Sequence, residues 1–79
     1  MQYQNFGKFQ RQKRESLKPN VSLNKFALNN DIEPAILSRI ENMKQDVKMT
    51  TLYKIAAGYG LSGSELLREF EAFQKKELD

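Results

Sequence analysis

Apolar residues recur at helical spacing along this chain of 79 residues, and no window alternates strictly between apolar and polar positions as a strand would. Five segments combine this period with helix start or stop residues, and they span about 4–16, 23–30, 34–42, 49–59 and 63–78. The pattern therefore predicts an all-α fold of five helices. The length predicts a single domain over residues 1–79.

Capping residues support these boundaries. Ser22 precedes the second segment, where its hydroxyl can accept a hydrogen bond from an unpaired backbone N–H. Pro34 opens the third segment, at a position whose N–H would have no helical partner. Gly60 follows the fourth segment, as glycine often does at the end of a helix. Ser62 and Glu65 have the spacing of a capping box, so we expect them to begin the fifth helix.

The second and third segments are short, and a tight turn at residues 30–32 joins them. Ile32 is apolar inside this turn, so we expect it to fill the space where the two helices cross. Helices joined in this way cross at roughly 90–120° and present the second helix outward. The outward face of the third segment is small and polar, and consists of Ala35, Ser38, Arg39 and Asn42. A narrow polar ridge fits the major groove of DNA, where an arginine can make two hydrogen bonds to guanine.

Composition excludes several kinds of chemistry. The chain has no cysteine and no histidine, which excludes a disulfide scaffold, a thiolate metal site and a serine or cysteine triad. Mean hydropathy is −0.69, and no apolar run approaches the ~18 residues of a membrane span. The N-terminal segment has no signal-peptide core. We therefore expect a cytoplasmic binding protein that is not an enzyme, uses no metal or small-molecule cofactor and contacts no membrane.

Charge is distributed unevenly along the chain. Residues 1–25 contain six bases and one acid, residues 26–60 are neutral, and residues 61–79 contain three bases and five acids. The excess of bases in residues 1–25 suggests a surface that faces a polyanion. A solvated basic helix is the other explanation, and the charge pattern alone supports both.

Spaced motifs across residues 22–67 resemble a known family. The motifs are Ser22, Phe26-Ala27, Asp31-Ile32, Leu37-Ser38-Arg39-Ile40-Glu41, Leu52-Tyr53-Lys54-Ile55-Ala56, Leu61-Ser62 and Glu65-Leu66-Leu67. In this order and without a gap they resemble the Cro and phage-repressor-like (XRE) helix-turn-helix family. The resemblance implies a five-helix, lambda-repressor-like DNA-binding domain with a core of about 4–67. It also implies a helix-turn-helix at the second and third helices and an extended C-terminal helix over about 63–78.

The resemblance further implies roles for individual residues, with double-stranded DNA as the partner. The positions that face the bases are Glu33, Pro34, Ala35, Ser38 and Arg39. The positions that face phosphates are Ser22, Asn24, Lys25, Asn42, Lys44 and Lys48. Arg14 and Glu41 match a structural pair that joins the first helix to the third.

Five residues depart from the family pattern. Leu23 replaces a polar residue that contacts phosphate, and Gln10 occupies a position that is usually aliphatic. Asp31 and Met43 stand where glycine is usual, and aspartate tolerates a left-handed φ better than most residues do. Glu33 adds a negative charge beside the expected groove surface. There it could favour the helix dipole, accept a hydrogen bond from cytosine, or weaken DNA binding.

The last helix suggests how the chain assembles. Because Phe70 and Phe73 lie beyond the four-helix core of the family, we expect them to form a homodimer interface together with Leu66. The function that follows is a sequence-specific, repressor-like transcription regulator that binds a pseudo-palindromic operator as a homodimer. Domains of this length resemble restriction–modification controllers and short antitoxins. The alternative is a protein-interaction module or antitoxin with the same fold and weak or no specific DNA binding.

Overall fold

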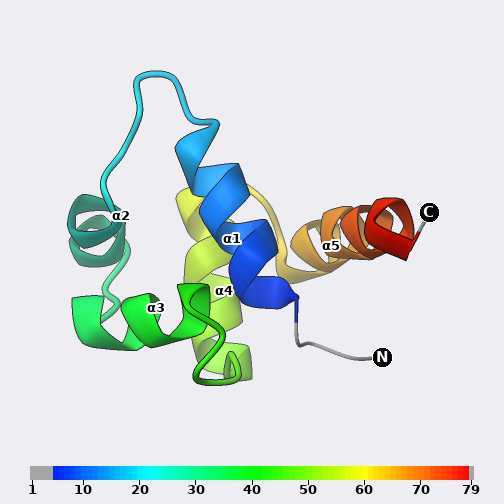
Figure 1. Ribbon diagram of the computed structural model, residues 1–79. Coiled ribbons are helices and arrows are strands. Elements are labelled where there is room, and N and C mark those ends of the chain that lie inside the picture. The colour runs from blue at the N-terminus through cyan, green and yellow to red at the C-terminus, as the bar shows by residue number, and fades with distance from the viewer. Residues whose placement is uncertain (1–4, 79) are drawn as a thin grey trace.

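The computed structural model describes residues 5–78, and within them the chain forms five α-helices and no strand (Figure 1). The helices are α1 (Phe6–Glu15), α2 (Leu23–Asn29), α3 (Pro34–Glu41), α4 (Met49–Gly58) and α5 (Gly63–Leu78). The predicted all-α fold is confirmed, and the helix ends agree with the predicted ones to within one residue. The exception is the predicted start of the first helix at residue 4, which lies outside the described residues.

α1 and α4 occupy the middle of the view, with α2 and α3 on one side of them and α5 on the other (Figure 1). α1 packs against α3 and α5, α2 packs against α3, and α4 packs against α5. All five helices and the α2–α3 turn contribute side chains to one core. The buried apolar residues are Phe6, Phe9, Phe26, Ala27, Ile32, Leu37, Ile40, Leu52, Ile55, Ala56, Leu66 and Phe70.

An aromatic cluster joins α1 to α5. The Phe70 ring centroid lies 5.3 Å from that of Phe6 and 5.5 Å from that of Phe9, and Phe73 lies 5.5 Å from Phe9. Leu66 and Phe70 are both 0% exposed within the single chain. The expectation that these two residues contact a second copy is therefore wrong, because α5 folds back onto α1 and both side chains complete the chain's own core. Phe73 is half-buried at the edge of the cluster.

α2, α3 and α4 end with the same backbone arrangement. The residue that reverses the chain has a left-handed φ, which is 58° at Asp31, 60° at Met43 and 72° at Gly60. In each case the next backbone N–H bonds to the carbonyl five residues earlier, at 2.8–2.9 Å. After α2 this turn directs Ile32 into the core, where it is 6% exposed, as the sequence predicts.

Ser62 and Glu65 form the predicted capping box at the start of α5. Ser62 N–H donates to Glu65 Oε1 at 2.8 Å, and Glu65 N–H donates to Ser62 Oγ at 3.1 Å. Hydrogen bonding from the Ser62 backbone, and secondarily from its side chain, lowers the pKa of the Glu65 carboxyl below its ordinary value. The box therefore satisfies backbone donors that an uncapped helix would leave unpaired.

Replacing Ser62 with alanine is expected to lower the free energy of unfolding by about 1 kcal/mol, because the Glu65 N–H loses its acceptor. Glu65→Gln is expected to change the pH dependence of stability. A carboxyl whose pKa is lower in the folded state stabilises the fold above its unfolded pKa, and this contribution is lost as the pH falls through the folded pKa. Urea unfolding of wild type and Glu65→Gln should therefore differ at neutral pH and converge as the pH falls below 4.5.

The matched control for this prediction is Glu71→Gln, because Glu71 is exposed on the same helix and forms no ion pair within residues 5–78. It should follow the wild type at every pH. A difference between wild type and Glu65→Gln that stays constant with pH would contradict the role given to the Glu65 carboxylate.

Candidate nucleic-acid interface

Polar side chains surround the start of α2. Ser22 Oγ accepts a hydrogen bond from Lys25 N–H at 3.2 Å, so the predicted N-cap is confirmed. The Ser22 hydroxyl proton is not used in this contact and can be donated to another acceptor. Asn24 and Lys25 are exposed beside it. Leu23, which departs from the family pattern, is half-buried and packs against the core, so it contributes apolar contact at this position.

α3 presents the predicted ridge to solvent. Glu33, Ala35 and Arg39 are exposed, and Pro34 and Ser38 are half-buried. The opposite face of α3 is buried, and the helix packs against α1 and α2. The division of α3 into an outer polar face and an inner apolar face is therefore as predicted, while the base contacts of the five residues stay predictions.

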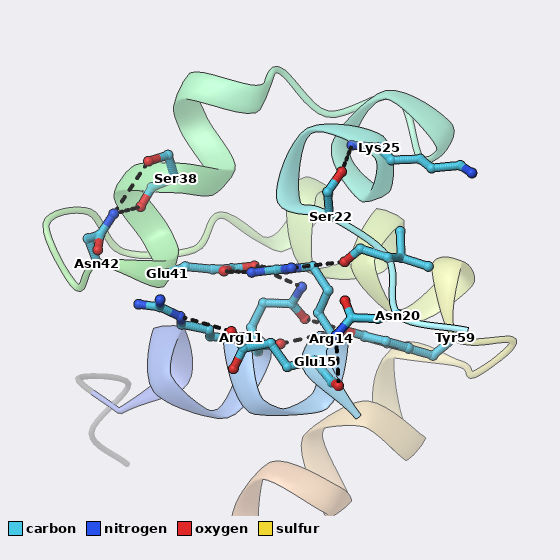
Figure 2. Close-up of polar contacts among 12 residues, drawn as sticks. Arg11, Arg14, Glu15, Asn20, Ser22, Lys25, Ser38, Glu41, Asn42 and Tyr59 are labelled. Atoms are coloured by element: carbon cyan, nitrogen blue, oxygen red, sulfur yellow. Dashed lines mark hydrogen bonds and ion pairs between the residues drawn. The ribbon is translucent and has the colours of Figure 1, made fainter. Parts of the chain in front are cut away.

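Asn42 follows α3 and stabilises its last turn. Its Nδ2 donates to the Ser38 carbonyl oxygen at 2.8 Å and to Ser38 Oγ at 3.3 Å (Figure 2). This contact orients the Ser38 hydroxyl on the outer face of α3. Lys44 and Lys48 are exposed on the segment that leads to α4. These three positions stay predicted phosphate contacts.

A buried ion pair connects α1 to the end of α3 (Figure 2). Arg14 Nε donates to Glu41 Oε2 at 3.0 Å, and Arg14 Nη2 donates to Glu41 Oε1 at 2.8 Å. Two parallel bonds of this kind fix both orientation and distance. A third donor, Arg14 Nη1, bonds at 2.9 Å to the carbonyl oxygen of Val21, the residue before Ser22. The predicted pair thus joins α1, α3 and the segment that enters α2.

Both members of this ion pair are buried. Arg14 is 7% exposed and Glu41 is 4% exposed. The hydrogen bond to Glu41 raises the pKa of the Arg14 guanidinium above its ordinary value, although burial opposes this effect. The Arg14 guanidinium therefore keeps its charge beside the Glu41 carboxylate, and each group depends on the other for its ionic partner.

Gln10 and Tyr59 extend the ion pair toward α4. Gln10 is 0% exposed, and its Nε2 donates to Glu41 Oε2 at 3.4 Å. Its Oε1 accepts from Tyr59 Oη at 2.8 Å. Burial raises the pKa of the Tyr59 hydroxyl, which keeps it protonated as a donor. Gln10 therefore occupies a usually aliphatic position because both ends of its amide have buried partners.

Ion pairs neutralise much of the positive charge in residues 1–25. Two pairs join α1 to α5 and one lies within α1, namely Lys8–Glu77, Lys13–Glu69 and Arg11–Glu15. In contrast, four bases around α2 and α3 form no ion pair within residues 5–78, namely Lys25, Arg39, Lys44 and Lys48. Glu33 and Asp46 are exposed acids of the same region, and neither forms an ion pair with another described residue. The bases of α1 are therefore paired, whereas the region around α2 and α3 keeps more unpaired bases than unpaired acids.

Comparison with known proteins identifies the family. The chain is 39% identical over 54 residues to Control protein C.MunI of Mycoplasma sp, and the match covers 68% of this chain and 73% of that protein. The chain belongs to the XRE-like helix-turn-helix class of control proteins. The resemblance inferred from the sequence motifs is therefore confirmed. No family model and no solved structure matches the chain.

Three further positions of this control-class protein, Asp31, Met43 and Glu33, depart from the wider family pattern. Asp31 adopts the left-handed φ that its side chain tolerates. Met43 adopts the same conformation with a side chain that is 57% exposed, and nothing in the structure explains why glycine is absent there. Glu33 lies at the N-cap of α3 but its side chain makes no capping hydrogen bond, so its carboxylate remains free on the outer face.

Sequence analysis assigned no role to Gln45, which contacts Arg39, one of the exposed base-facing candidates. Arg39 Nε donates to Gln45 Oε1 at 2.8 Å. Gln45 lies between α3 and α4, outside any periodic segment, so hydrophobic periodicity had no means of identifying it.

Within residues 5–78, no group of three or more Asp or Glu side chains could hold a metal ion. No helix of that part of the chain is long and apolar enough to cross a membrane.

Proposed function

We propose that this protein is a sequence-specific, DNA-binding transcription regulator of the restriction–modification control type, with α2–α3 as its helix-turn-helix and α3 in the major groove. The observation that carries the proposal is the exposed polar ridge of α3, which lies in the region where unpaired bases outnumber unpaired acids. Membership of the control-protein class supports it. The absence of histidine and cysteine fits a protein that binds rather than catalyses.

The proposed contacts divide by chemistry. Arg39 donates to guanine, and Ser38 donates or accepts at a neighbouring base. Pro34 and Ala35 permit close approach and offer apolar contact to a thymine methyl group. Phosphate contacts come from residues at the start of α2 and after the end of α3, namely Ser22, Asn24, Lys25, Asn42, Lys44 and Lys48. Glu33 contributes to base choice either by accepting from cytosine or by excluding other bases.

The buried Arg14–Glu41 ion pair, on the inner side of α3, supports the same function. Arg14 holds Glu41 at the end of α3 and the Val21 carbonyl at the entry to α2, so both ends of the DNA-facing pair are tied to α1. Base contacts require side chains to be held within fractions of an ångström. Rigid support of α2 and α3 by one buried arginine therefore favours sequence-specific binding over loose electrostatic contact.

A homodimer is part of the proposal. Two α3 helices must lie about 34 Å apart, one turn of DNA, to contact both halves of a pseudo-palindromic operator. With Leu66 and Phe70 buried, Phe73 is the remaining candidate of the three predicted interface residues. Phe73 is half-buried and borders, with Phe9 and Ala72, a groove of about 370 Å³ between α1 and α5. A second copy that covered this groove would bury the exposed part of Phe73.

The test is selection of bound sequences from random duplex DNA at two salt concentrations. Wild type is expected to enrich a palindrome, with affinity that falls steeply as salt rises. Arg39→Ala should lose the preference at one base pair of each half-site, a loss of about 1–3 kcal/mol. Lys44→Ala should weaken binding to all sequences and reduce the salt slope by about 1.

Arg68→Ala serves as the control, because Arg68 is exposed on α5 and forms no ion pair within the described residues. It should change neither the preference nor the salt slope. If wild type enriches no sequence at either salt concentration, sequence-specific regulation is excluded.

One observation favours a second candidate function, a protein-interaction module or antitoxin with this fold. Glu33 is an exposed carboxylate at the start of the proposed DNA-contacting helix, with no ion pair among the described residues, and there it repels phosphate. This function predicts that DNA affinity is absent even at low salt and that Arg39→Ala changes nothing.

A further inference from the structure

One of the five donors of Arg39 is already in use in the free protein. Its Nε donates to Gln45 Oε1 at 2.8 Å. Arg39 lies in the last turn of α3, and Gln45 lies six positions later in the chain, after the helix has ended. Nε carries one of the five N–H groups of the planar guanidinium, so the remaining groups all belong to Nη1 and Nη2. The far edge of the guanidinium is therefore the part that remains able to bind DNA.

The turn after α3 brings Gln45 to this position. Met43 adopts a φ of 60°, and Lys44 N–H donates back to the Arg39 carbonyl oxygen at 2.8 Å. This reversal directs the chain back along the last turn of α3. Gln45 follows immediately and is half-buried, so its own side chain is restrained. The turn thus places Gln45 within reach of Arg39, and the two side chains form their hydrogen bond on the exposed surface beside the end of α3.

We propose that Gln45 is a positioning residue that holds Arg39 so that the Nη1–Nη2 edge of its guanidinium faces guanine. The inference rests on the proposed DNA-binding function and names the residue that sets its specificity. An unrestrained arginine can approach a base by the Nη1–Nη2 edge or by the edge that includes Nε. With Nε bound to Gln45 the second edge is excluded, and part of the ordering of a flexible side chain precedes binding.

The test compares wild type with Gln45→Met, which keeps the length of the side chain and removes the acceptor. Selection with wild type and Arg39→Ala first identifies the base pair whose preference depends on Arg39. Kd is then measured on duplexes that differ only at that base pair. Gln45→Met is expected to reduce the preference about 3- to 10-fold. Affinity for a duplex without the operator and the midpoint of thermal unfolding should stay unchanged, which a merely structural role would not allow.

Two further variants isolate the effect. In the Arg39→Ala background, Gln45→Met should have no effect on the preference, because the residue it positions is gone. Glu71→Met changes an exposed side chain on α5 that does not line the groove between α1 and α5, and it should show the wild-type preference.

Each failure has a distinct meaning. An undiminished preference in Gln45→Met overturns the positioning role and leaves DNA binding intact. An equal loss of affinity on all duplexes also overturns it, because Gln45 would then support phosphate contact or folding. If Arg39→Ala keeps the wild-type preference, Arg39 is not the base-contacting residue and the inference fails. If wild type shows no preference for any sequence, the proposed function and the inference fail together.

Discussion

Replacing Arg14 with methionine is expected to lower the free energy of unfolding by about 3–5 kcal/mol. Methionine occupies a similar volume but leaves the Glu41 carboxylate, 4% exposed, without its charged partner. The remaining bond to Glu41, from Gln10 Nε2 at 3.4 Å, is long. The Val21 carbonyl oxygen also loses its donor. Because small domains are stable by only about 5–15 kcal/mol, a large part of the population should unfold well below the wild-type midpoint. Urea and thermal unfolding followed by circular dichroism measure the loss.

Two variants separate the buried pair from a general effect of losing an arginine. Arg11→Ala removes a 3.5 Å pair with Glu15 on the exposed side of α1 and should cost at most about 1 kcal/mol. The double variant Arg14→Met/Glu41→Leu should recover part of the stability lost in Arg14→Met, since no isolated charge is then buried. The recovery should be partial, because the Val21 carbonyl lacks its donor in both variants and Gln10 Nε2 also loses its acceptor once Glu41 is replaced. A cost below about 1 kcal/mol for Arg14→Met would contradict the buried ion pair.

Gly7→Ala is expected to destabilise the protein by about 3 kcal/mol or more, although the same change in a solvent-exposed helix stabilises by about 0.5–1 kcal/mol. A Cβ at residue 7 would overlap the carbonyl oxygen of Ile40 and lie 2.9 Å from the carbonyl carbon. These are backbone atoms of α3, which cannot rotate away as a side chain can. α1 and α3 would have to separate, which would also strain the Arg14–Glu41 pair that spans the same interface.

Gly60→Ala is the control variant for this prediction. A Cβ there would meet nothing within 4 Å, so the cost arises only from the φ of 72° and should be about 1–2 kcal/mol. Urea midpoints of the two variants should therefore be ordered with Gly7→Ala below Gly60→Ala, and Gly60→Ala below wild type. A stabilising Gly7→Ala would mean that α1 and α3 do not approach as closely as the structure describes.

Much of the local structure could be predicted from the chain itself. Helical spacing and capping residues located all five helices, because both act over a few consecutive residues. Ser22, Pro34 and the Ser62–Glu65 box lie at the predicted helix starts. The apolar residue of the α2–α3 turn, Ile32, is buried as expected.

The candidate site could be predicted only in part. The outer face of α3 follows from the position of its apolar residues, so the exposure of Ala35 and Arg39 was accessible to sequence analysis. The Arg14–Glu41 pair, 27 residues apart, came from family resemblance and not from any local pattern. The Gln45 contact was missed, because a loop residue has no period that relates it to a helix face.

The helices and their apolar faces are thus properties of short stretches of sequence, whereas the partners of those faces are decided by the fold. A hydrophobic stripe indicates that a face is buried, but burial is non-directional and does not distinguish the same chain from a second copy. Leu66 and Phe70 therefore looked like an interface and are core, because α5 folds back onto α1. Hydrogen bonds and ion pairs act only at short range and need both partners in position. Gln10 and Tyr59, 49 residues apart, could be recognised as partners only once α1 and α4 had been brought together.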